Sequence, residues 1–327
     1  MLVISKSEVE RLLPLEACLA AMRGAMLATS AGAVCLPIRQ YMAIPGMPGK
    51  LVLMPGALKD PACFGIKLVC KYDRSHDDPL GSHVGMALLF DSLSGVPLAM
   101  IEGSSLTAIR TSAASALATD VLARPNSTRL AIIGNGEQAM RHVHAMRAVR
   151  PISTIAIWGR DFDRAELFAQ QMAAQTQLPT VAFRLIEDAV VGADIICTTT
   201  ATRTPVLAGA LLEPGMHVNL VGSAIAATAE VDSAAVARSR FFVDYREAAL
   251  AAAGELLAAI KSKVIDESHI AGEIGEVIAG DVVGRQSSDQ ITVYKSLGVA
   301  SQDLAAAHAV WQAAKAQGLG KAIDLLA

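Results

Sequence analysis

The chain has 327 residues and a formal net charge of −3. This length is enough for two domains, and the small net charge disfavours nucleic acid or an anionic membrane surface as a partner. Although 53% of the residues are hydrophobic, charged or polar residues interrupt every apolar run before the roughly 18 residues that a membrane span needs. We therefore expect no membrane span.

The N-terminal residues and the cysteines bear on the cellular compartment of the protein. Residues 1–6 lack a basic start followed by a long apolar core, so we expect no signal peptide. The five cysteines are scattered, and none forms a Cys-x-x-Cys pair. This usage is typical of reduced, mostly buried thiols in a cytoplasmic protein. No histidines or cysteines have the spacing of metal ligands, so no metal site is predicted.

The first predicted element is a helix over residues 7–31. Ser7 is its expected N-cap because Glu10 follows three residues later, and apolar positions recur between Leu12 and Met26. Farther along, short runs of β-forming residues are separated by proline and glycine turns, which favours an antiparallel sheet. These runs cover residues 50–54, 64–72, 83–91 and 97–102.

The pattern changes after an alanine-rich helix expected over residues 105–123. Strands and helices then alternate, as in a doubly wound parallel sheet. Residues 268–298 contain several glycines and look loop-rich, and a last helix is expected from Ser301 to Gln317. The strands of the alternating region are predicted near residues 129–133, 154–158, 193–197, 217–222 and 240–244.

The first of these strands ends in a glycine turn. An apolar run closes at Gly134-Asn135-Gly136, and a helical pattern follows from Glu137. Strand, glycine turn and helix together form the dinucleotide-binding fingerprint, in which the backbone and the helix N-terminus receive a pyrophosphate. A purely structural turn is the alternative. The second strand, after a helix-length gap, favours the nucleotide site.

The residues after that second strand bear on the choice of cofactor. An acidic side chain there would bind the ribose 2′-hydroxyl of NAD. Here Gly159 occupies the likely acidic position and Arg160 follows, which favours a 2′-phosphate and hence NADP(H). Asp161 keeps NAD(H) as an alternative.

Three isolated basic residues lie in apolar or β-like sequence in the first half of the chain. They are Arg39, Lys67 and Arg110, the last at the start of the alanine-rich helix. A buried cation is costly unless it is paired or functional. Each could be an ordinary salt-bridge partner. Together, beside a nucleotide domain, they favour a pocket that binds a carboxylate.

Taken together, these segments and others make the chain resemble the ornithine cyclodeaminase/μ-crystallin family over nearly its whole length. The most specific segment runs from Gly95-Val96-Pro97-Leu98-Ala99 through Leu106-Thr107-Ala108-Ile109-Arg110-Thr111-Ser112-Ala113-Ala114. Further matching segments are 134–139, Pro214-Gly215-Met216-His217-Val218-Asn219, Glu230-Val231-Asp232 and Ile291-Thr292-Val293-Tyr294-Lys295-Ser296-Leu297-Gly298.

The resemblance implies a homodimer whose fold is α/β, with a Rossmann doubly wound parallel sheet inserted into a discontinuous α+β domain. The expected domains are residues 1–117 with 300–327, for substrate binding and dimerisation, and residues 118–299, for the dinucleotide. No nucleic acid or membrane partner is expected.

The same resemblance assigns site residues. Arg39, Lys67 and Arg110 match positions that hold the substrate carboxylate, with Lys67 beside the reacting nitrogen; Lys67 and Arg110 are the expected catalytic residues. Ser82 or His83 would line the same cavity, and Tyr41 and Ser223 would also contact the substrate. The expected cofactor-binding residues are Thr111, Gly134, Asn135, Gly136, Glu137, Gln138, Arg160, Thr198, Thr199, Val221, Gly222, Ser296 and Leu297.

One departure from the family pattern bears on the reaction. Ala224 stands where cyclodeaminases and related alanine dehydrogenases carry an aspartate, although Ser223 or an acidic residue elsewhere could compensate. The sequence therefore favours NAD(P)H-dependent reduction of a small 2-imino acid to the L-amino acid. Δ1-Pyrroline-2-carboxylate, Δ1-piperideine-2-carboxylate and an acyclic imine such as iminosuccinate are candidate substrates. The alternatives are an ornithine cyclodeaminase, an alanine dehydrogenase, or a non-catalytic binding protein.

Overall fold

The computed structural model describes residues 1–72, 74, 78, 80–81 and 83–325. The chain forms two compact units, Met1–Arg110 with Gly298–Ala327 (unit 1) and Thr111–Leu297 (unit 2). Each unit contains one eight-stranded sheet. The predicted domain boundaries, after residues 117 and 299, lie a few residues later in the chain than these unit boundaries.

Unit 1 is built on a mostly antiparallel sheet. Its strand order is β16-β1-β7-β6-β5-β4-β2, with β3 paired to β4. The antiparallel pairing of β4 to β7 confirms the sheet expected from the sequence. The strands are β1 (Leu2–Ile4), β2 (Val34–Cys35), β3 (Gln40–Ala43), β4 (Lys50–Leu58), β5 (Cys63–Lys71), β6 (His83–Asp91), β7 (Pro97–Glu102) and β16 (Lys321–Ala322).

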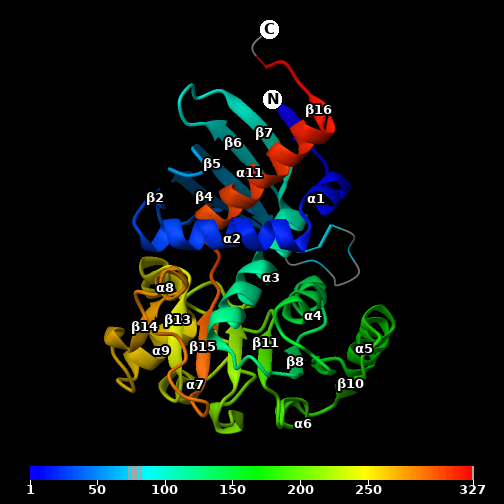
Figure 1. Cartoon of the computed structure of the whole chain (residues 1–327), viewed down its shortest axis with the longest axis vertical. Helices are drawn as coiled ribbons and strands as arrows, with labels where there is room; N and C mark the ends of the chain where they lie inside the picture. The colour runs from blue at the N-terminus through cyan, green and yellow to red at the C-terminus, as the bar shows by residue number, and fades with distance from the viewer. Residues whose placement is uncertain (73, 75–77, 79, 82, 326–327) are drawn as a thin grey trace. The chain divides into compact units, whose positions relative to one another are not determined.

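Two long helices cover one face of this sheet. Helices α2 (Leu15–Ser30) and α11 (Ala300–Gln317) pack on each other, and α11 contacts β4, β5 and β6 (Figure 1). The single helix predicted over residues 7–31 is wrong, because α1 (Lys6–Leu12) ends before Pro14, which caps α2. A residue before proline disfavours the helical conformation. The N-cap of α1 is Ser5, paired with Glu8, and not Ser7.

Unit 2 is built on a wholly parallel sheet in the order β10-β9-β8-β11-β12-β15-β13-β14. The strand order reverses between β8 and β11, the switch point at which doubly wound folds bind nucleotides. The strands are β8 (Arg129–Ile133), β9 (Thr154–Trp158), β10 (Thr180–Phe183), β11 (Ile195–Thr198), β12 (His217–Leu220), β13 (Arg240–Val243), β14 (Ile270–Glu273) and β15 (Thr292–Lys295).

Helices connect these strands. The alanine-rich helix α3 begins in unit 1 and ends in unit 2, as predicted from the sequence within two residues at its start and one at its end. The helices of this part are α3 (Gly103–Leu122), α4 (Glu137–Val149), α5 (Phe162–Thr176), α6 (Ile186–Val190), α7 (Ser233–Ala237), α8 (Arg246–Ala252), α9 (Gly254–Lys261) and α10 (Ile274–Ala279), with 3-10 turns Gly209–Leu211 and Glu267–His269.

The expectation of a loop-rich segment over residues 268–298 is wrong. The segment contains β14, α10 and β15, and β15 lies inside the sheet between β12 and β13. All four residues of β15 are buried. In the described part of the chain no single helix is long and apolar enough to cross a membrane; α1 and α2, bent by 83° at their break, pass that test only as a pair.

Candidate active site

The glycine turn joins β8 to α4 at the switch point of unit 2. Gly134 has a φ of +128°, and a Cβ there would lie 2.6 Å from Thr199 Oγ1. Its N–H donates to Trp158 O at 2.7 Å, and Thr199 N–H donates to Ile133 O at 2.8 Å. Only glycine fits this backbone, which is held between β9 and β11.

The second glycine of the turn leaves open space. Gly136 is exposed and caps α4, and a Cβ there would have no heavy atom within 4 Å. The first N–H groups of α4 therefore open onto a surface without a side chain. Gln138 follows in the first turn, and its buried Oε1 has no hydrogen-bond partner among the described residues. This cradle and the unpartnered oxygen fit a dinucleotide.

The end of β9 carries the residues expected to contact the ribose. Gly159 is buried, and a Cβ there would lie 3.3 Å from the amide of Asn135, so a larger side chain is disfavoured. Asp161 caps α5 by accepting from Arg164 N–H at 3.2 Å. Arg160 is exposed. Both side chains are thus exposed, and the acidic one is engaged with a helix.

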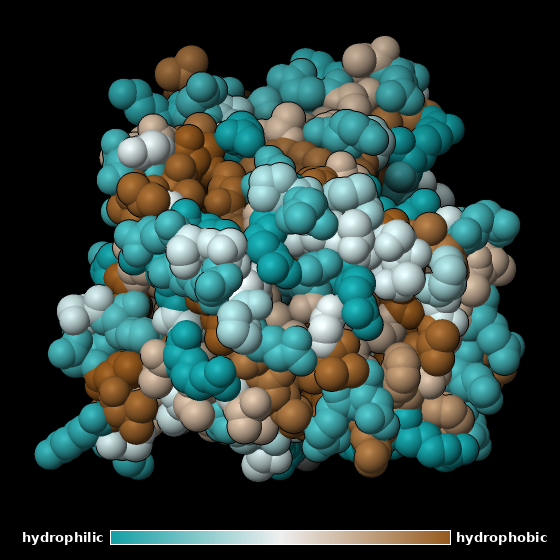
Figure 2. All heavy atoms as spheres, turned by 60° about the horizontal axis from the view of Figure 1, so that its bottom comes forward, coloured by the Kyte–Doolittle hydropathy of each residue, from teal (hydrophilic) through white to brown (hydrophobic). Residues whose placement is uncertain are grey.

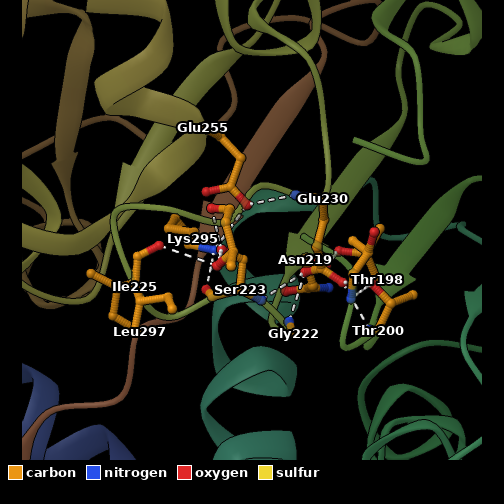
Figure 3. Close-up of polar contacts among 12 residues, drawn as sticks. Thr198, Thr200, Asn219, Gly222, Ser223, Ile225, Glu230, Glu255, Lys295 and Leu297 are labelled. Atoms are coloured by element: carbon orange, nitrogen blue, oxygen red, sulfur yellow. Dashed lines mark hydrogen bonds and ion pairs between the residues drawn. The ribbon is translucent and has the colours of Figure 1, made fainter. Parts of the chain in front are cut away.

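A buried glutamate organises the neighbouring strand ends (Figure 3). Glu230 Oε1 accepts from Thr200 N–H at 2.8 Å and from Thr200 Oγ1 at 2.7 Å. Glu230 Oε2 accepts from Thr198 Oγ1 at 2.8 Å, from Gly222 N–H at 2.6 Å and from Ser223 N–H at 3.3 Å. Glu230 therefore fixes the segments that follow β11 and β12, including several residues expected to bind the cofactor.

A second buried acid lies behind the first. Glu255 Oε1 accepts from Glu230 N–H and from Lys295 Nζ, both at 3.1 Å, and all three side chains are fully buried. Lys295 Nζ also donates to Ser223 O (Figure 3). The Ser223 hydroxyl donates to Thr228 O at 2.6 Å. The network ties β15 to the loop that leads from β12.

The remaining residues expected to bind the cofactor lie after strands of the unit 2 sheet or in α3. Val221 N–H donates to Thr198 O at 3.0 Å, and Ser296 N–H donates to Leu220 O at 2.9 Å, so both lie at the carboxyl ends of neighbouring parallel strands. Leu297 N–H donates to Asp244 Oδ2 at 2.9 Å. Thr111 is buried in α3, where unit 2 begins.

Unit 1 contains a buried cluster of charged side chains. Lys67, on β5, is 3% exposed, and its Nζ donates to Asp303 Oδ1 at 2.7 Å. Arg110 Nε donates to the same oxygen at 2.8 Å, and Arg110 NH1 donates to Gln302 Oε1 at 2.9 Å. Asp303 Oδ2 is buried and has no hydrogen-bond partner among the described residues. One carboxylate oxygen thus joins two of the predicted basic residues.

The third basic residue reaches the same end of α11. Arg39 NH2 donates to Gly298 O. Gly298 has a φ of +73°, and a Cβ there would lie 2.6 Å from Arg110 NH1. The structure therefore brings Arg39, Lys67 and Arg110 together around residues 298–303. Because Lys67 and Arg110 share one carboxylate and Arg39 adds a third cation nearby, the cluster favours a further anion.

The charges of the cluster alter its titration. Burial lowers the pKa of the Lys67 ammonium to about 7; Arg110 and Arg39 act in the same direction, and Asp303 opposes them. Burial raises the pKa of the Asp303 carboxyl, but the charges and hydrogen bonds of Arg110 and Lys67 outweigh it, so the pKa lies below its ordinary value. The cluster thus holds a carboxylate and a lysine able to exchange a proton near neutral pH.

Two other residues expected to line the substrate cavity lie on the same sheet. Tyr41 is on β3, where it is 43% exposed, and Lys50 Nζ lies 5.1 Å from the centre of its ring. His83 is the first residue of β6 and is exposed. Ser82 lies outside the described residues.

Sequence reasoning missed several polar residues that hold the two clusters together. Asp303 and Gln302 were assigned only to the last helix, and Lys295 to a loop-rich segment. Glu230 was noted only within a segment that matches the family and was given no role, although a glutamate in an otherwise apolar surrounding is a signal for a buried polar network. Glu255 follows Gly254 in alanine-rich sequence, where it stands out in the same way.

Comparisons with known proteins agree with this arrangement. A Δ1-pyrroline-2-carboxylate reductase from Bacillus cereus is 35% identical over 325 residues, covering 99% of this chain and 100% of that protein. The structure of the Thermococcus litoralis Δ1-pyrroline-2-carboxylate reductase in complex with NADH and L-proline is 32% identical, has a TM-score of 0.95, and covers 99% of this chain and 100% of that chain. An archaeal alanine dehydrogenase dimer with bound NAD is 29% identical, has a TM-score of 0.93, and covers 100% and 99%.

The profile of one protein family matches residues 1–318, nearly the whole chain. The match includes the glycine turn of unit 2 and the basic residues of unit 1. The chain belongs to the ornithine cyclodeaminase/mu-crystallin family.

Proposed function

We propose that the protein is an NAD(P)H-dependent reductase that converts a small 2-imino acid to the L-amino acid. The observation that carries this proposal is the cluster in which the buried Lys67 and Arg110 share one oxygen of Asp303, with the half-buried Arg39 nearby on Gly298 O. Such a cluster suits the carboxylate of a substrate. The two reductases that resemble this chain over its full length act on Δ1-pyrroline-2-carboxylate, which has that group.

The two units divide the chemistry. Unit 2 has the turn for a dinucleotide, and a bound reduced nicotinamide supplies hydride to the carbon of a C=N bond. In unit 1, Arg39 and Arg110 bind the substrate carboxylate and so fix the orientation of the imine. Lys67 Nζ gives a proton to the imine nitrogen. In this proposal the side chains of the protein position the substrate and donate the proton.

Imine reduction is expected to be the fast direction at neutral pH. Ala224 offers no carboxylate to deprotonate an amino-acid ammonium, whereas an imine needs no such step. Purified protein should therefore oxidise NADH or NADPH with Δ1-pyrroline-2-carboxylate, Δ1-piperideine-2-carboxylate or an imine formed from a 2-oxo acid and ammonia. L-Proline or L-alanine should be oxidised only at high pH. Absorbance at the nicotinamide band measures both directions.

The same panel separates the alternatives. Proline and ammonia formed from ornithine, at a rate that matches the best imine, would indicate a cyclodeaminase. Fast oxidation of alanine at neutral pH would indicate an alanine dehydrogenase. Ligand binding without turnover of any imine would indicate a non-catalytic binder.

We further propose that NADP(H) is the preferred cofactor. The support is Arg160, which is exposed after β9, together with Asp161, which caps α5. Arg160→Ala should weaken NADPH much more than NADH, because only NADPH has a 2′-phosphate. Fluorescence titration of the two cofactors measures this. A wild-type protein that already binds NADH much more tightly than NADPH would contradict the proposal, and NAD(H) would then be the cofactor.

We also propose that the protein is a homodimer formed through unit 1. The side chains that alternate with the helix-covered ones on β4 to β7 form a sheet face that is apolar and only partly buried. By contrast, hydrophilic and hydrophobic residues are interspersed over the side seen in Figure 2. A similar chain is a dimer. This apolar sheet face comprises Leu53, Pro55, Phe64, Ile66, Leu68, Met86, Leu88, Phe90, Leu98 and Met100.

Leu88→Glu should convert the dimer to a monomer. Leu88 is paired with Ile66 and Met100 near the middle of the apolar sheet face, where a second copy would bury the new charge without a partner. Sedimentation measures the mass. Leu93→Glu is the matched control, since Leu93 is 95% exposed in the turn after β6. A dimer that persists in Leu88→Glu would contradict this interface.

The cytoplasm is the proposed compartment. All five cysteines have free thiols, three of them buried. Free thiols persist in a reducing environment.

A further inference from the structure

Asp303 is the one acidic group that contacts Lys67 and Arg110 among the described residues of unit 1. It lies in the first turn of α11, and the positive end of the helix dipole adds to the charges of the two cations. Both cations bind the same oxygen, Oδ1, at 2.7 and 2.8 Å. The position of Lys67 Nζ therefore depends on Asp303, and Arg110 is held by the same contact.

We propose that Asp303 is a positioning residue that holds the Lys67 ammonium in place, in its protonated form, for proton donation to the substrate nitrogen. This inference rests on the proposed imine reduction. Asp303 then acts through Lys67 and does not contact the reacting atoms.

The proton transfer balances as follows. The lone pair of the imine nitrogen takes a proton from Lys67 Nζ, and the Nζ–H bond breaks. Hydride supplied by a bound reduced nicotinamide would form the new C–H bond, and the two π electrons of C=N would become the lone pair of the amine nitrogen; the nicotinamide would be oxidised and the imine reduced. Lys67 is left neutral beside the Asp303 carboxylate, which favours its reprotonation from solvent.

The surroundings of Lys67 explain why a carboxylate is needed. Arg110 approaches from α3, Arg39 lies before β3, and His83 lies on the neighbouring strand β6. Burial disfavours the Lys67 ammonium most, and the positive charges of Arg110 and Arg39 add to this effect. These effects lower the pKa of Lys67 to about 7, and Asp303 opposes them. Partial loss of water contact and the nearby lysines lower the pKa of His83 to about 4, so its imidazole is neutral at pH 7. Without the charge of Asp303, Lys67 would be largely neutral at pH 7 and could not donate.

Asp303→Asn tests the proposal because it removes the charge and little else. The amide oxygen can replace Oδ1, and the amide NH2 can point where Oδ2 has no described partner. The rate of imine reduction falls as pH rises through the pKa of Lys67, since the ammonium is the donor. In the variant this fall should move to lower pH by roughly one unit or more. At pH 8 the rate should then drop about tenfold, whereas at pH 5.5 it should recover to within about threefold of wild type.

A matched control separates charge at this site from loss of an ion pair elsewhere. Asp120→Asn removes the carboxylate that binds Arg150 at 2.9 Å in unit 2. Its pH profile should coincide with that of wild type. An Asp303→Asn profile that is lowered equally at every pH would assign Asp303 to structure alone and overturn the proposal.

A measurement on the cofactor-free protein is independent of activity. Lysine labelled with 13C at Cε gives the titration of Lys67, identified by the signal that Lys67→Met lacks. The midpoint should lie near pH 7 in wild type and lower in Asp303→Asn. In wild type the 13Cγ signal of Asp303 should shift at the same midpoint, which also tests the pair if the variant does not fold. Unlinked midpoints would overturn the proposal, whereas a protein that shows the linked titration but reduces no imine would contradict only the proposed function.

Discussion

Gly136→Val is expected to abolish binding of NADH and NADPH while leaving the fold intact. The side chain would project into the open space at the N-terminus of α4, where the proposed site receives the pyrophosphate. The fold should tolerate the change because the φ of Gly136 is −97°, and no heavy atom lies within 4 Å of the new Cβ. Cofactor fluorescence measures binding, and circular dichroism and thermal unfolding measure the fold.

Gly24→Val is the matched control. Gly24 is exposed on α2 in unit 1 and has equally open surroundings, so the same substitution there should leave cofactor affinity unchanged. If Gly136→Val binds the cofactor as tightly as wild type does, the glycine turn is not the dinucleotide site.

Lys67→Met is expected to lower kcat by about 10²–10⁴-fold, the usual contribution of a general acid, with a smaller change in KM. Methionine keeps an unbranched side chain of similar length, and Asp303 retains its bond to Arg110 at 2.8 Å. The loss should therefore lie in proton donation more than in packing or in binding of the substrate carboxylate. Steady-state kinetics with the best imine separates kcat from KM.

The pH profile gives this prediction a second readout. The fall in rate above pH 7 should disappear from Lys67→Met, because the titrating donor is gone. A variant as active as wild type would limit Lys67 to a structural role.

Local sequence patterns predicted much of the fold. The bounds of β6, β7, β8 and β9 agree with the predicted runs, since each is a stretch of strand-forming residues between clear turn signals. Helix 7–31 failed because the apolar spacing continues across Pro14, whereas the backbone does not. β15 was missed because four residues beside several glycines look like a loop, although the buried sheet around them makes them a strand.

The candidate site could be predicted only in part, for a similar reason. The basic residues stand out locally, because a lysine or arginine within apolar sequence needs an explanation. Their partner does not: Asp303 is 236 residues from Lys67 and 193 from Arg110, and it resembles any acidic residue in the first turn of a helix. Pairing at such separation is set by tertiary structure.

The discontinuous unit has a consequence for the order in which the protein folds during synthesis. Residues 1–110 leave the ribosome first, but α11, which covers β4 to β6 and carries Asp303, is made last. Until then the sheet lacks one of the two helices that cover it, and Lys67 and Arg110 lack the carboxylate that compensates their burial. Unit 2 is continuous from Thr111 to Leu297 and needs no later segment for its own sheet. The middle of the chain can therefore fold before the beginning, and the final helix completes the first unit last.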